Sequence, residues 1–390
     1  MMLPNGWKKV KLGDLVSVAS GRNKVRNDMG KYPVYGSTGI IGLCDDFQYS
    51  GDSILIARVG ANAGFIHRAN GQYDVSDNTL VVECGKEYDF AFAYQQLRGI
   101  NLNQYVFGSG QPLVTGGLLK KIELSLPPLE EQKKMAEILS VWDKAIEKTE
   151  KLIEAKETQK KALISNLTDG NTIEKFKLGN VVIDKSKWNK KNFSEVFEFL
   201  STNTYSREYM SYDGGNVKNV HYGDVLVKYA EVLDVETTDI PYLKPDVDTS
   251  KMALLRSGDI VIADTAEDET VGKTVEVVNV GQNLIVSGLH TMFCRPQKNL
   301  FSPGWLGYYI NSNDYHKQLI PLMAGIKVSS IAKKDIVNTT ILIPSLSEQK
   351  IIVEILSDAS KEIDLLKRQL DNYKKQKQGL MQNSSPANGE

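Results

Sequence analysis

The chain carries one segment twice, and this repeat constrains its fold more than any single residue does. The stretches PPLEEQK at 127–133 and PSLSEQK at 344–350 begin 217 positions apart, and EILS follows each of them at the same distance. A repeat that closes each half of a 390-residue chain indicates a tandem of two similar modules. We therefore expect two globular domains, each followed by a long helix, and a partner or target with two-fold character.

Each copy of the repeat opens a helix whose apolar seam has a 3.5-residue period. The seam of the first helix consists of Leu139, Trp142, Ile146, Thr149, Ile153, Lys156, Lys160 and Leu163. The seam of the second consists of Leu356, Ala359, Ile363, Leu366, Leu370, Tyr373, Lys377 and Leu380. Charged residues fill the other faces. Two unrelated amphipathic helices, each packed on its own domain, are the alternative, but the shared register would then be a coincidence.

The entry motif has a physical reason at each position. Pro127 and Pro344 end strand-like runs at 122–126 and 340–343, because proline cannot donate to a sheet ladder. Acidic residues then fall in the first helical turn, where the helix dipole favours negative charge. Ser347 can also cap the second helix.

The chain order of domain, helix, domain, helix predicts that the two helices pair antiparallel if their seams meet. In that register Lys160 faces Ala359 and Lys377 faces Trp142. We predict an α+β fold in which two similar domains are separated by two long antiparallel coiled-coil helices with pseudo-two-fold symmetry. The predicted boundaries are 1–127 for the first domain, 128–170 for the central spacer helix, 171–344 for the second domain, 345–382 for the C-terminal spacer helix and 383–390 for a disordered tail.

The two globular halves read alike, as short strands broken by glycine-containing turns. The opening at Lys11–Leu15 is matched with 176–181, and the apolar strand after Gly51 is matched with the one after Gly258. Helices are expected over 90–97 and 305–315. The halves are therefore expected to share a fold and to differ in their loops.

Composition places limits on the class of protein. The net charge is −1, so no global field indicates a nucleic-acid partner, although local basic loops could still serve one. The three cysteines, Cys44, Cys84 and Cys294, are odd in number and lack the spacing of a metal site. No apolar run approaches the length of a membrane span and the N-terminus lacks a signal-peptide core, so we expect a cytoplasmic protein.

Motifs for catalysis are largely missing from the sequence. The Asn/Asp-Pro-Pro-aromatic signature of DNA-base methyltransferases is not found. Gly272-Lys273-Thr274 lacks the glycine that a phosphate loop needs at position 267. Pro245-Asp246 has no Glu-x-Lys partner of a nuclease and is interpreted as a surface turn. The isolated histidines are interpreted as structural or DNA-facing.

Several of these motifs together resemble a known family. They are the repeated Pro-x-Leu-x-Glu-Gln helix, the Lys-Leu-Gly-Asp opening after Gly6-Trp7, the loop Tyr35–Gly39 and the Gly-Asp strands. In this combination the chain resembles, over essentially its whole length, the specificity subunit of type I restriction–modification systems. The paired Glu-Gln helices are the specific part of that resemblance, and the strand motifs alone are weak.

The resemblance implies a non-catalytic DNA-binding subunit with two target-recognition domains, each reading one half of a bipartite double-stranded sequence. The helices would set the spacer and dock two methyltransferase subunits, and a motor-nuclease subunit would join the complex. S-adenosylmethionine, ATP and Mg are then expected in the partner subunits, with no cofactor or metal in this chain. The alternatives are the specificity chain of a related two-subunit restriction enzyme, a single-chain restriction enzyme or methyltransferase, and a coiled-coil adaptor without DNA specificity.

Reading a DNA half-site requires side chains at base edges and cations at phosphates. For each candidate residue a solvated loop position is the competing interpretation, but cationic residues cluster with glycine in these loops. The DNA-binding candidates of the first domain are Arg22, Asn23, Lys24, Arg26, Ser37, Thr38, Arg58, Asn62 and Gln111. Those of the second domain are Tyr205, Ser206, Arg207, Lys218, His221, Tyr222, Lys228, Thr265 and Lys327.

Overall fold

A computed structural model describes residues 3–22, 26–27, 29–100, 102–105, 113–168, 175–178, 181–325 and 328–383. The candidates Asn23, Lys24, Gln111 and Lys327 lie outside these described residues, as does the tail from 384 onward. The chain divides into two compact units, 1–152 with 366–390, and 153–365. The globular part of each unit is termed the first or the second domain.

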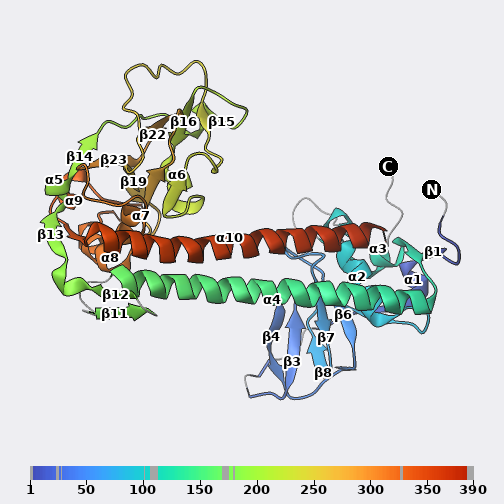
Figure 1. The fold of residues 1–390 in the computed structure, drawn as a ribbon. Coiled ribbons are helices and arrows are strands. Elements are labelled where there is room, and N and C mark those ends of the chain that lie inside the picture. The colour runs from blue at the N-terminus through green and yellow to red at the C-terminus, as the bar shows by residue number, and fades with distance from the viewer. Residues whose placement is uncertain are drawn as a thin grey trace. The chain divides into compact units, whose positions relative to one another are not determined.

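The first domain is built on two four-stranded sheets (Figure 1). The antiparallel sheet has the order β2 (Val16–Ser20), β9 (Thr79–Cys84), β6 (Ser53–Ala57) and β7 (Ile66–Ala69). The other has the order β4 (Gly39–Cys44), β3 (Tyr32–Gly36), β8 (Gln72–Val75) and β5 (Tyr49–Ser50), with β3 and β8 parallel. The remaining elements are β1 (Lys8–Lys11), α1 (Leu12–Leu15), α2 (Phe90–Gly99), the 3-10 helix η1 (Leu102–Tyr105), α3 (Gly116–Lys120) and β10 (Glu123–Leu126).

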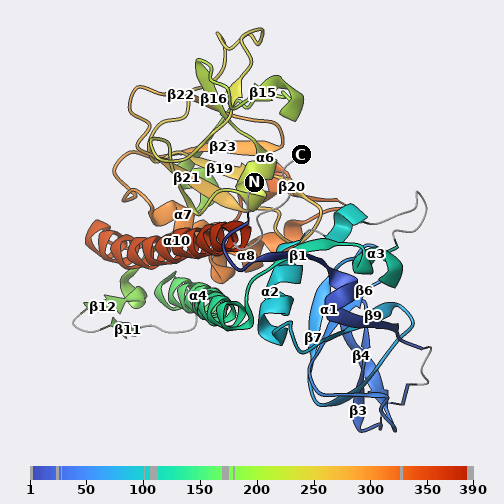
Figure 2. The ribbon, with the colours of Figure 1, turned by 90° about the vertical axis from the view of Figure 1, so that its right-hand side faces the viewer.

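The second domain is likewise built on two sheets (Figure 2), and its larger sheet has one strand more than that of the first domain. Its larger sheet has the order β14 (Phe197–Leu200), β23 (Thr291–Pro296), β19 (Ile260–Ala263), β21 (Thr274–Val278) and β17 (Val232–Asp234). Its smaller sheet has the order β15 (Met210–Ser211), β18 (Tyr242–Leu243), β16 (Val217–Val220) and β22 (Leu284–Ser287), with β16 and β22 parallel.

The other elements of the second unit connect and cover these sheets. The strands are β11 (Lys175–Leu178), β12 (Val181–Asp184), β13 (Asn189–Asn192), β20 (Thr265–Ala266), β24 (Ser329–Ser330) and β25 (Thr340–Ile343). The α-helices are α5 (Phe193–Val196), α6 (Tyr222–Val227), α7 (Trp305–Ile310), α8 (Asn313–Leu319) and α9 (Lys333–Ile336). The 3-10 helices are η2 (Lys185–Lys187), η3 (Arg207–Tyr209) and η4 (Ile320–Leu322).

The match of 176–181 with the opening of the chain is wrong. In the first domain β1 pairs with β10 and runs into α1, and in the second domain β13 pairs with β25 and runs into α5. The same capping bond occurs in both, since the backbone N–H of Lys11 donates to Asp14 and that of Asn192 donates to Glu195. Residues 175–178 and 181–184 instead form the additional antiparallel strand pair β11 and β12.

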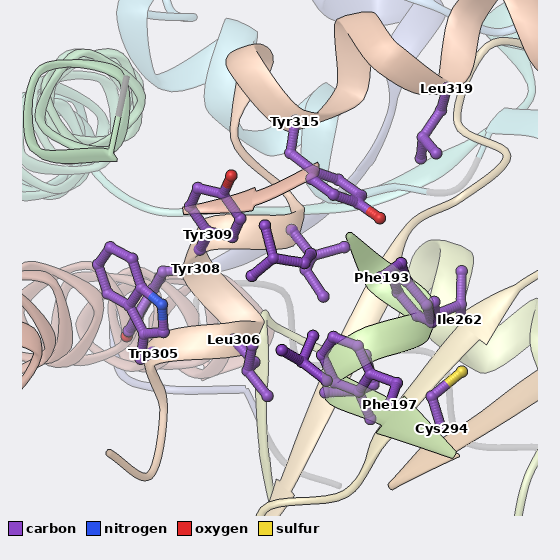
Figure 3. Close-up of a cluster of buried hydrophobic side chains, with 14 of the residues drawn as sticks. Phe193, Phe197, Ile262, Cys294, Trp305, Leu306, Tyr308, Tyr309, Tyr315 and Leu319 are labelled. Carbon is purple, nitrogen blue, oxygen red and sulfur yellow. The ribbon is translucent and has the colours of Figure 1, made fainter. Parts of the chain in front are cut away.

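The core of the second domain is strongly aromatic (Figure 3). Trp305 stacks on Tyr309 with ring centroids 5.4 Å apart and meets Trp188 edge-on at 5.7 Å. Trp188 directly precedes β13, so its burial anchors the start of the domain against α7. Aromatic side chains bury large apolar areas, and such pairs add roughly 0.5–1.5 kcal/mol beyond that burial.

The two long helices are α4 (Leu129–Thr168) and α10 (Leu346–Asn383), and they pair antiparallel. Within the first unit, Asp143 contacts Lys377 at 2.5 Å and Glu150 contacts Lys374 at 2.7 Å. The residue numbers along α10 thus fall as those along α4 rise. The prediction that Lys377 faces Trp142 holds for the register, since its partner is the next residue of α4. Lys377 binds the neighbouring carboxylate of Asp143, because an ammonium gains more from a charged partner.

The indole of Trp142 packs edge-on against the ring of Tyr373 at 5.6 Å. Within the second unit, Lys156 pairs with Glu362 at 2.8 Å, and Lys160 and Ala359 line one groove between the helices, as the seam register predicts. No helix in the described ranges is both long and apolar enough to cross a membrane.

A buried glutamine fastens each long helix to its domain. The Gln132 side chain accepts from the Asp89 backbone N–H at 2.8 Å and donates to the carbonyls of Glu87 and Pro127 at 3.0 and 2.9 Å. Gln349 accepts from the Ser302 N–H at 2.7 Å and donates to the carbonyls of Leu300 and Pro344, both at 3.0 Å. The two side chains are 1% and 0% exposed. The repeated glutamine therefore satisfies three backbone groups at the same place in each domain.

Removing either amide leaves these backbone groups buried without a partner. We expect Gln132→Met and Gln349→Met each to lower the free energy of unfolding by about 1–3 kcal/mol, measured by urea denaturation. Lys134→Met and Lys350→Met change exposed neighbours on the same helical turns and serve as matched controls. Losses no larger than those of the controls would show that the glutamines do not fasten the helices.

Glu276 is a buried acid of β21 that caps α7. Its carboxylate accepts from the backbone N–H groups of Gly304 at 2.7 Å and Gly307 at 3.0 Å. Burial raises the pKa of Glu276 to about 7, and the two N–H donors oppose that rise only in part. The structurally equivalent position on β7 is Arg68, which lies over the Phe90 ring at 4.8 Å.

An acid with a raised folded-state pKa binds more protons when folded than when unfolded. The contribution of Glu276 is therefore fully present below its usual pKa of 4.5 and is lost as pH rises toward about 7. We expect Glu276→Gln to flatten the fall in unfolding free energy across this window, measured by urea denaturation at a series of pH values. The exposed Glu269→Gln is the control, and a profile for Glu276→Gln parallel to that of the wild type would contradict the assignment.

Candidate nucleic-acid interface

In the first domain, strands of both sheets end at one edge, and three backbone hydrogen bonds hold their ends together. The N–H of Arg22 donates to the Val75 carbonyl at 3.1 Å, and the N–H of Ser76 donates to the Tyr35 carbonyl at 2.8 Å. The N–H of Arg58 donates to the Asn78 carbonyl at 2.8 Å. Arg22, Arg58 and the end of β3 are thus gathered around the turn at 76–78.

The candidate side chains at this edge are held to different degrees. Arg22 and Thr38 are exposed, whereas Ser37 is half-buried and its carbonyl lies 3.3 Å from Nε2 of His67. Arg58 is half-buried, and its buried Nε has no hydrogen-bond partner within the described residues. These are the first-domain candidates that the fold brings together.

Two further first-domain candidates lie beside this edge. Asn62 is half-buried in the loop after β6, and its carbonyl accepts from the Phe65 N–H at 2.9 Å. Arg26 lies alongside the edge strand β4, where its Nη1 donates to the Ile41 carbonyl at 3.3 Å. Arg26 therefore extends the candidate surface along the smaller sheet.

The second domain has the same edge built from equivalent bonds. The N–H of Asn203 donates to the Ser287 carbonyl at 3.0 Å, and the N–H of Gly288 donates to the Val220 carbonyl at 2.8 Å. The N–H of Asp264 donates to the His290 carbonyl at 3.1 Å. The backbone frame of the two edges is therefore the same, while the residues that it presents differ.

Arg207 is fixed by an ion pair at this second edge. Its Nη1 and Nη2 donate to the two carboxylate oxygens of Asp224 at 2.7 and 2.9 Å. The side chain of Asp224 is 7% exposed and that of Arg207 is 47% exposed. The hydrogen bonds to Asp224 raise the pKa of Arg207. The guanidinium is thus held in one orientation, with its outer part open to solvent.

His221 has a structural role in the same cluster. It is buried at the start of α6, and its Nδ1 accepts from the Gly223 N–H at 3.2 Å, which places the ring proton on Nε2. Burial, followed by the charge of Arg207, lowers the pKa of His221. Its ring contacts Tyr222, which in turn meets His290 edge-on at 5.3 Å. His221 supports Tyr222 and remains neutral.

The other second-domain candidates also have partners inside the domain. Lys218 donates to the Val235 carbonyl at 3.0 Å, and Lys228 donates to the Asp239 carbonyl at 2.6 Å and to the Tyr212 hydroxyl at 3.1 Å. Shorter-range contacts join Ser206 to Glu208 at 2.9 Å, Thr265 to Asp264 at 2.8 Å and the ring of Tyr205 to that of Tyr209 at 5.2 Å. Lys218 and Lys228 thus have hydrogen-bond partners inside the domain.

Several residues at these edges were not predicted from the sequence. Asn203 donates through Nδ2 to Asn219 at 2.7 Å and to the Ser287 carbonyl at 3.0 Å, which closes a polar network under the edge. Lys251 and Met252 face the 201–205 segment across a shallow hollow. Asn78 and His290 lie in turns that directly precede the strands starting at Thr79 and Thr291, and this placement is the only sequence signal for them. Within the described ranges, no three metal-ligating side chains cluster.

Comparison with known proteins agrees with the repeated architecture. A family model described as the type I restriction modification DNA specificity domain matches residues 4–157 and again residues 185–373. The second match begins just before Trp188, in keeping with the corrected opening of the second domain.

Similar proteins carry related descriptions. The chain is 24% identical over 408 residues to the "Type I restriction enzyme MjaVIII specificity subunit" of Methanocaldococcus jannaschii, covering 98% of this chain and 92% of that protein. It is 29% identical over 143 residues to the "Type I restriction enzyme EcoprrI specificity subunit" of Escherichia coli, covering 35% of this chain and 36% of that protein.

The fold is also similar to solved structures. The crystal structure of the type I restriction–modification S subunit from M. genitalium matches with a TM-score of 0.61 at 15% identity, covering 100% of this chain and 99% of that one. A chain from a study of complex assembly and conformational transition of the type I R-M system matches with a TM-score of 0.55 at 17% identity, covering 98% of each chain.

The ion pair predicts unequal effects of two arginine substitutions on stability. Arg207→Ala leaves the buried Asp224 carboxylate without its partner, so we expect a loss of roughly 1–3 kcal/mol of unfolding free energy. Arg22→Ala, at an exposed position, should stay within about 0.5 kcal/mol of the wild type. Urea denaturation measures both. The double change Arg207→Ala with Asp224→Asn should recover part of the loss, and no recovery would contradict the pairing.

Proposed function

Because this chain belongs to the type I restriction–modification specificity subunit family, we propose that it is the sequence-specific DNA-binding subunit of such a complex. The first domain, 1–127, reads one half of a bipartite double-stranded target, and the second domain, 171–344, reads the other. The chain itself performs no catalysis. Two methyltransferase subunits and a motor-nuclease subunit supply the chemistry, with S-adenosylmethionine, ATP and Mg bound there.

The observation that carries the proposal is the repeated backbone edge, termed the reading edge. It holds Arg22, Ser37, Thr38 and Arg58 in the first domain and Asn203, Arg207, His221 and Asp264 in the second. Arg58 and Asp264 follow equivalent strands, and their N–H groups bind the equivalent turn residues Asn78 and His290. One frame used twice, with different side chains at the same places, suits two readers of different base sequences. Sequence is read by side chains at base edges, whereas phosphate contacts position the protein.

The long helices support the spacer part of the proposal. Each is fixed to a domain by a buried glutamine, and the paired contacts along the helices set one register. A fixed register allows the two helices only one alignment along their length, as a DNA spacer of fixed length requires. We therefore propose that the helices α4 and α10 set the length of the DNA spacer.

The outer face of α4 supports a docking role. Ile138 and Val141 are 52% and 61% exposed and lie one turn apart, among charged residues. Exposed apolar side chains with a polar rim are typical of protein contact sites. We propose that the methyltransferase subunits dock on the helices, with these residues contributing beside the charged faces.

A selection from random duplex DNA tests the function. The purified chain is combined with its cognate methyltransferase subunit, and bound duplexes are recovered and sequenced. We expect enrichment of two short motifs separated by a spacer of fixed length. No enrichment would favour the adaptor without DNA specificity, and methylation by the chain alone would contradict a non-catalytic subunit. A cognate subunit that carries both methyltransferase and nuclease activities would identify the related two-subunit enzyme.

In the same selection, Arg22→Ala tests which half of the DNA motif the first domain reads. If Arg22 contacts a base, affinity for the first half-site should fall by about 1–3 kcal/mol while the second motif is unchanged. An equal loss on random duplexes would instead mark a phosphate contact. The exposed Lys86→Ala, which lies outside the reading edge, is the control.

A further inference from the structure

The two reading edges carry opposite charges at one equivalent backbone position. This position is Arg58 in the first domain and Asp264 in the second, each directly after the last residue of a central strand. We propose that Arg58 reads a guanine in the first half-site and that Asp264 reads a cytosine amino group in the second. The inference deepens the proposed function and rests on it.

The equivalence is established by backbone bonds on both sides of the two residues. The carbonyl of Arg58 accepts from the Val114 N–H at 2.8 Å, and that of Asp264 accepts from the Ile331 N–H at 2.9 Å. The next residues form matching bridges, Val59 with Leu113 and Thr265 with Ser330.

The strand ends that precede these residues match as well. Ala57 donates to the Phe65 carbonyl at 2.8 Å and accepts from Gly64, and Ala263 donates to the Lys273 carbonyl at 2.9 Å and accepts from Gly272. The two side chains therefore leave the same point of the same frame.

The surroundings of Asp264 suit a hydrogen-bond acceptor. Its Oδ1 accepts from the Thr265 hydroxyl at 2.8 Å and lies 3.7 Å from Nδ1 of His290. The carboxylate is still 27% exposed, so it can reach a ligand at the domain surface. His290 is half exposed beside it and is held edge-on by Tyr222. Asp264 is thus oriented by its neighbours and remains accessible.

The surroundings of Arg58 suit a donor. It is half-buried at the strand end, and its Nε–H finds no acceptor among the described residues. Arg22 and Asn78 lie beside it through the shared turn, and no carboxylate is paired with Arg58 in the described part of the domain. Arg58 therefore contrasts with Arg207, whose guanidinium is already paired with Asp224.

Base chemistry then separates the two domains. Guanine offers two acceptors in the major groove, which arginine can bind together, whereas cytosine offers an amino donor that aspartate can accept. A carboxylate near DNA is repelled by the phosphates, and under this proposal the hydrogen bond from a cytosine amino group offsets that repulsion. The same backbone frame thus presents a donor to a guanine in the first half-site and an acceptor to a cytosine in the second.

The test is the duplex selection with the full-length chain and its methyltransferase subunit, repeated for Arg58→Gln and Asp264→Asn. We expect Arg58→Gln to reduce the guanine preference at one position of the first motif by about tenfold and to leave the second motif unchanged. Asp264→Asn should reduce a cytosine preference in the second motif by a similar factor. Arg68→Gln and Asp213→Asn, exposed in the same domains, are the controls.

A second variant, Asp264→Ser, guards against a folding defect and should relax the same position if circular dichroism shows a native melting transition. Unchanged base preferences in folded Arg58 and Asp264 variants, with the wild-type split motif present, would overturn this inference alone. A uniform loss on all duplexes would also overturn it, because that marks a phosphate effect. A wild-type chain that enriches no split motif would overturn the proposed function itself.

Discussion

The buried glutamine at the start of each long helix is the contact on which the arrangement of each unit depends. Gln132 joins three parts of its unit, namely Pro127 at the end of the preceding strand, the strand-to-helix turn at 87 and the cap of α2 at Asp89. Gln349 does the same in the second unit. An amide is the side chain that can accept one bond and donate two here, whereas a carboxylate or an alkyl chain would leave buried backbone groups unsatisfied. This requirement explains why both copies of the repeat carry glutamine at this position.

Arg58 and Asp264 lie outside the hydrophobic cores of their domains. The cores lie beneath the strands, with Ile54 and Ile56 in the first domain and Ile260 and Ile262 in the second fully buried. Arg58 and Asp264, which differ between the two edges, lie beyond the strand ends, where backbone bonds hold the chain. A change from Arg58 to Asp264 at this position therefore leaves the core untouched. Under the proposed function, backbone bonds at this position hold the chain and the side chain contacts DNA.

The sequence predicted the two long helices and their pairing. The helices follow from a period, which needs only neighbouring residues, and their antiparallel pairing follows from the chain order of domain, helix, domain, helix. The opening of the second domain could not be found in this way, because β13 is recognised by its pairing with β25 about 150 residues away and shares little with β1 besides the preceding tryptophan. For the same reason, the DNA-binding candidates could be predicted from the sequence but their hydrogen-bond partners within the domain could not. Nothing local to Arg207, Lys218 or Lys228 reveals the carboxylate of Asp224 or the carbonyls of Val235 and Asp239.

The internal use of cations changes how the second domain would bind DNA under the proposed function. Arg207 is paired with Asp224, and Arg295 is paired with the buried Asp259 at 2.7 Å. A cation already neutralised by a carboxylate releases few counterions from DNA, and counterion release supplies most of non-specific affinity. With a net charge of −1, the chain has little electrostatic surplus to hold a duplex by itself. Base contacts at the two edges would then discriminate, while the methyltransferase subunits would supply much of the phosphate contact. Discrimination without strong non-specific binding is useful to a reader, because competing genomic sites far outnumber targets.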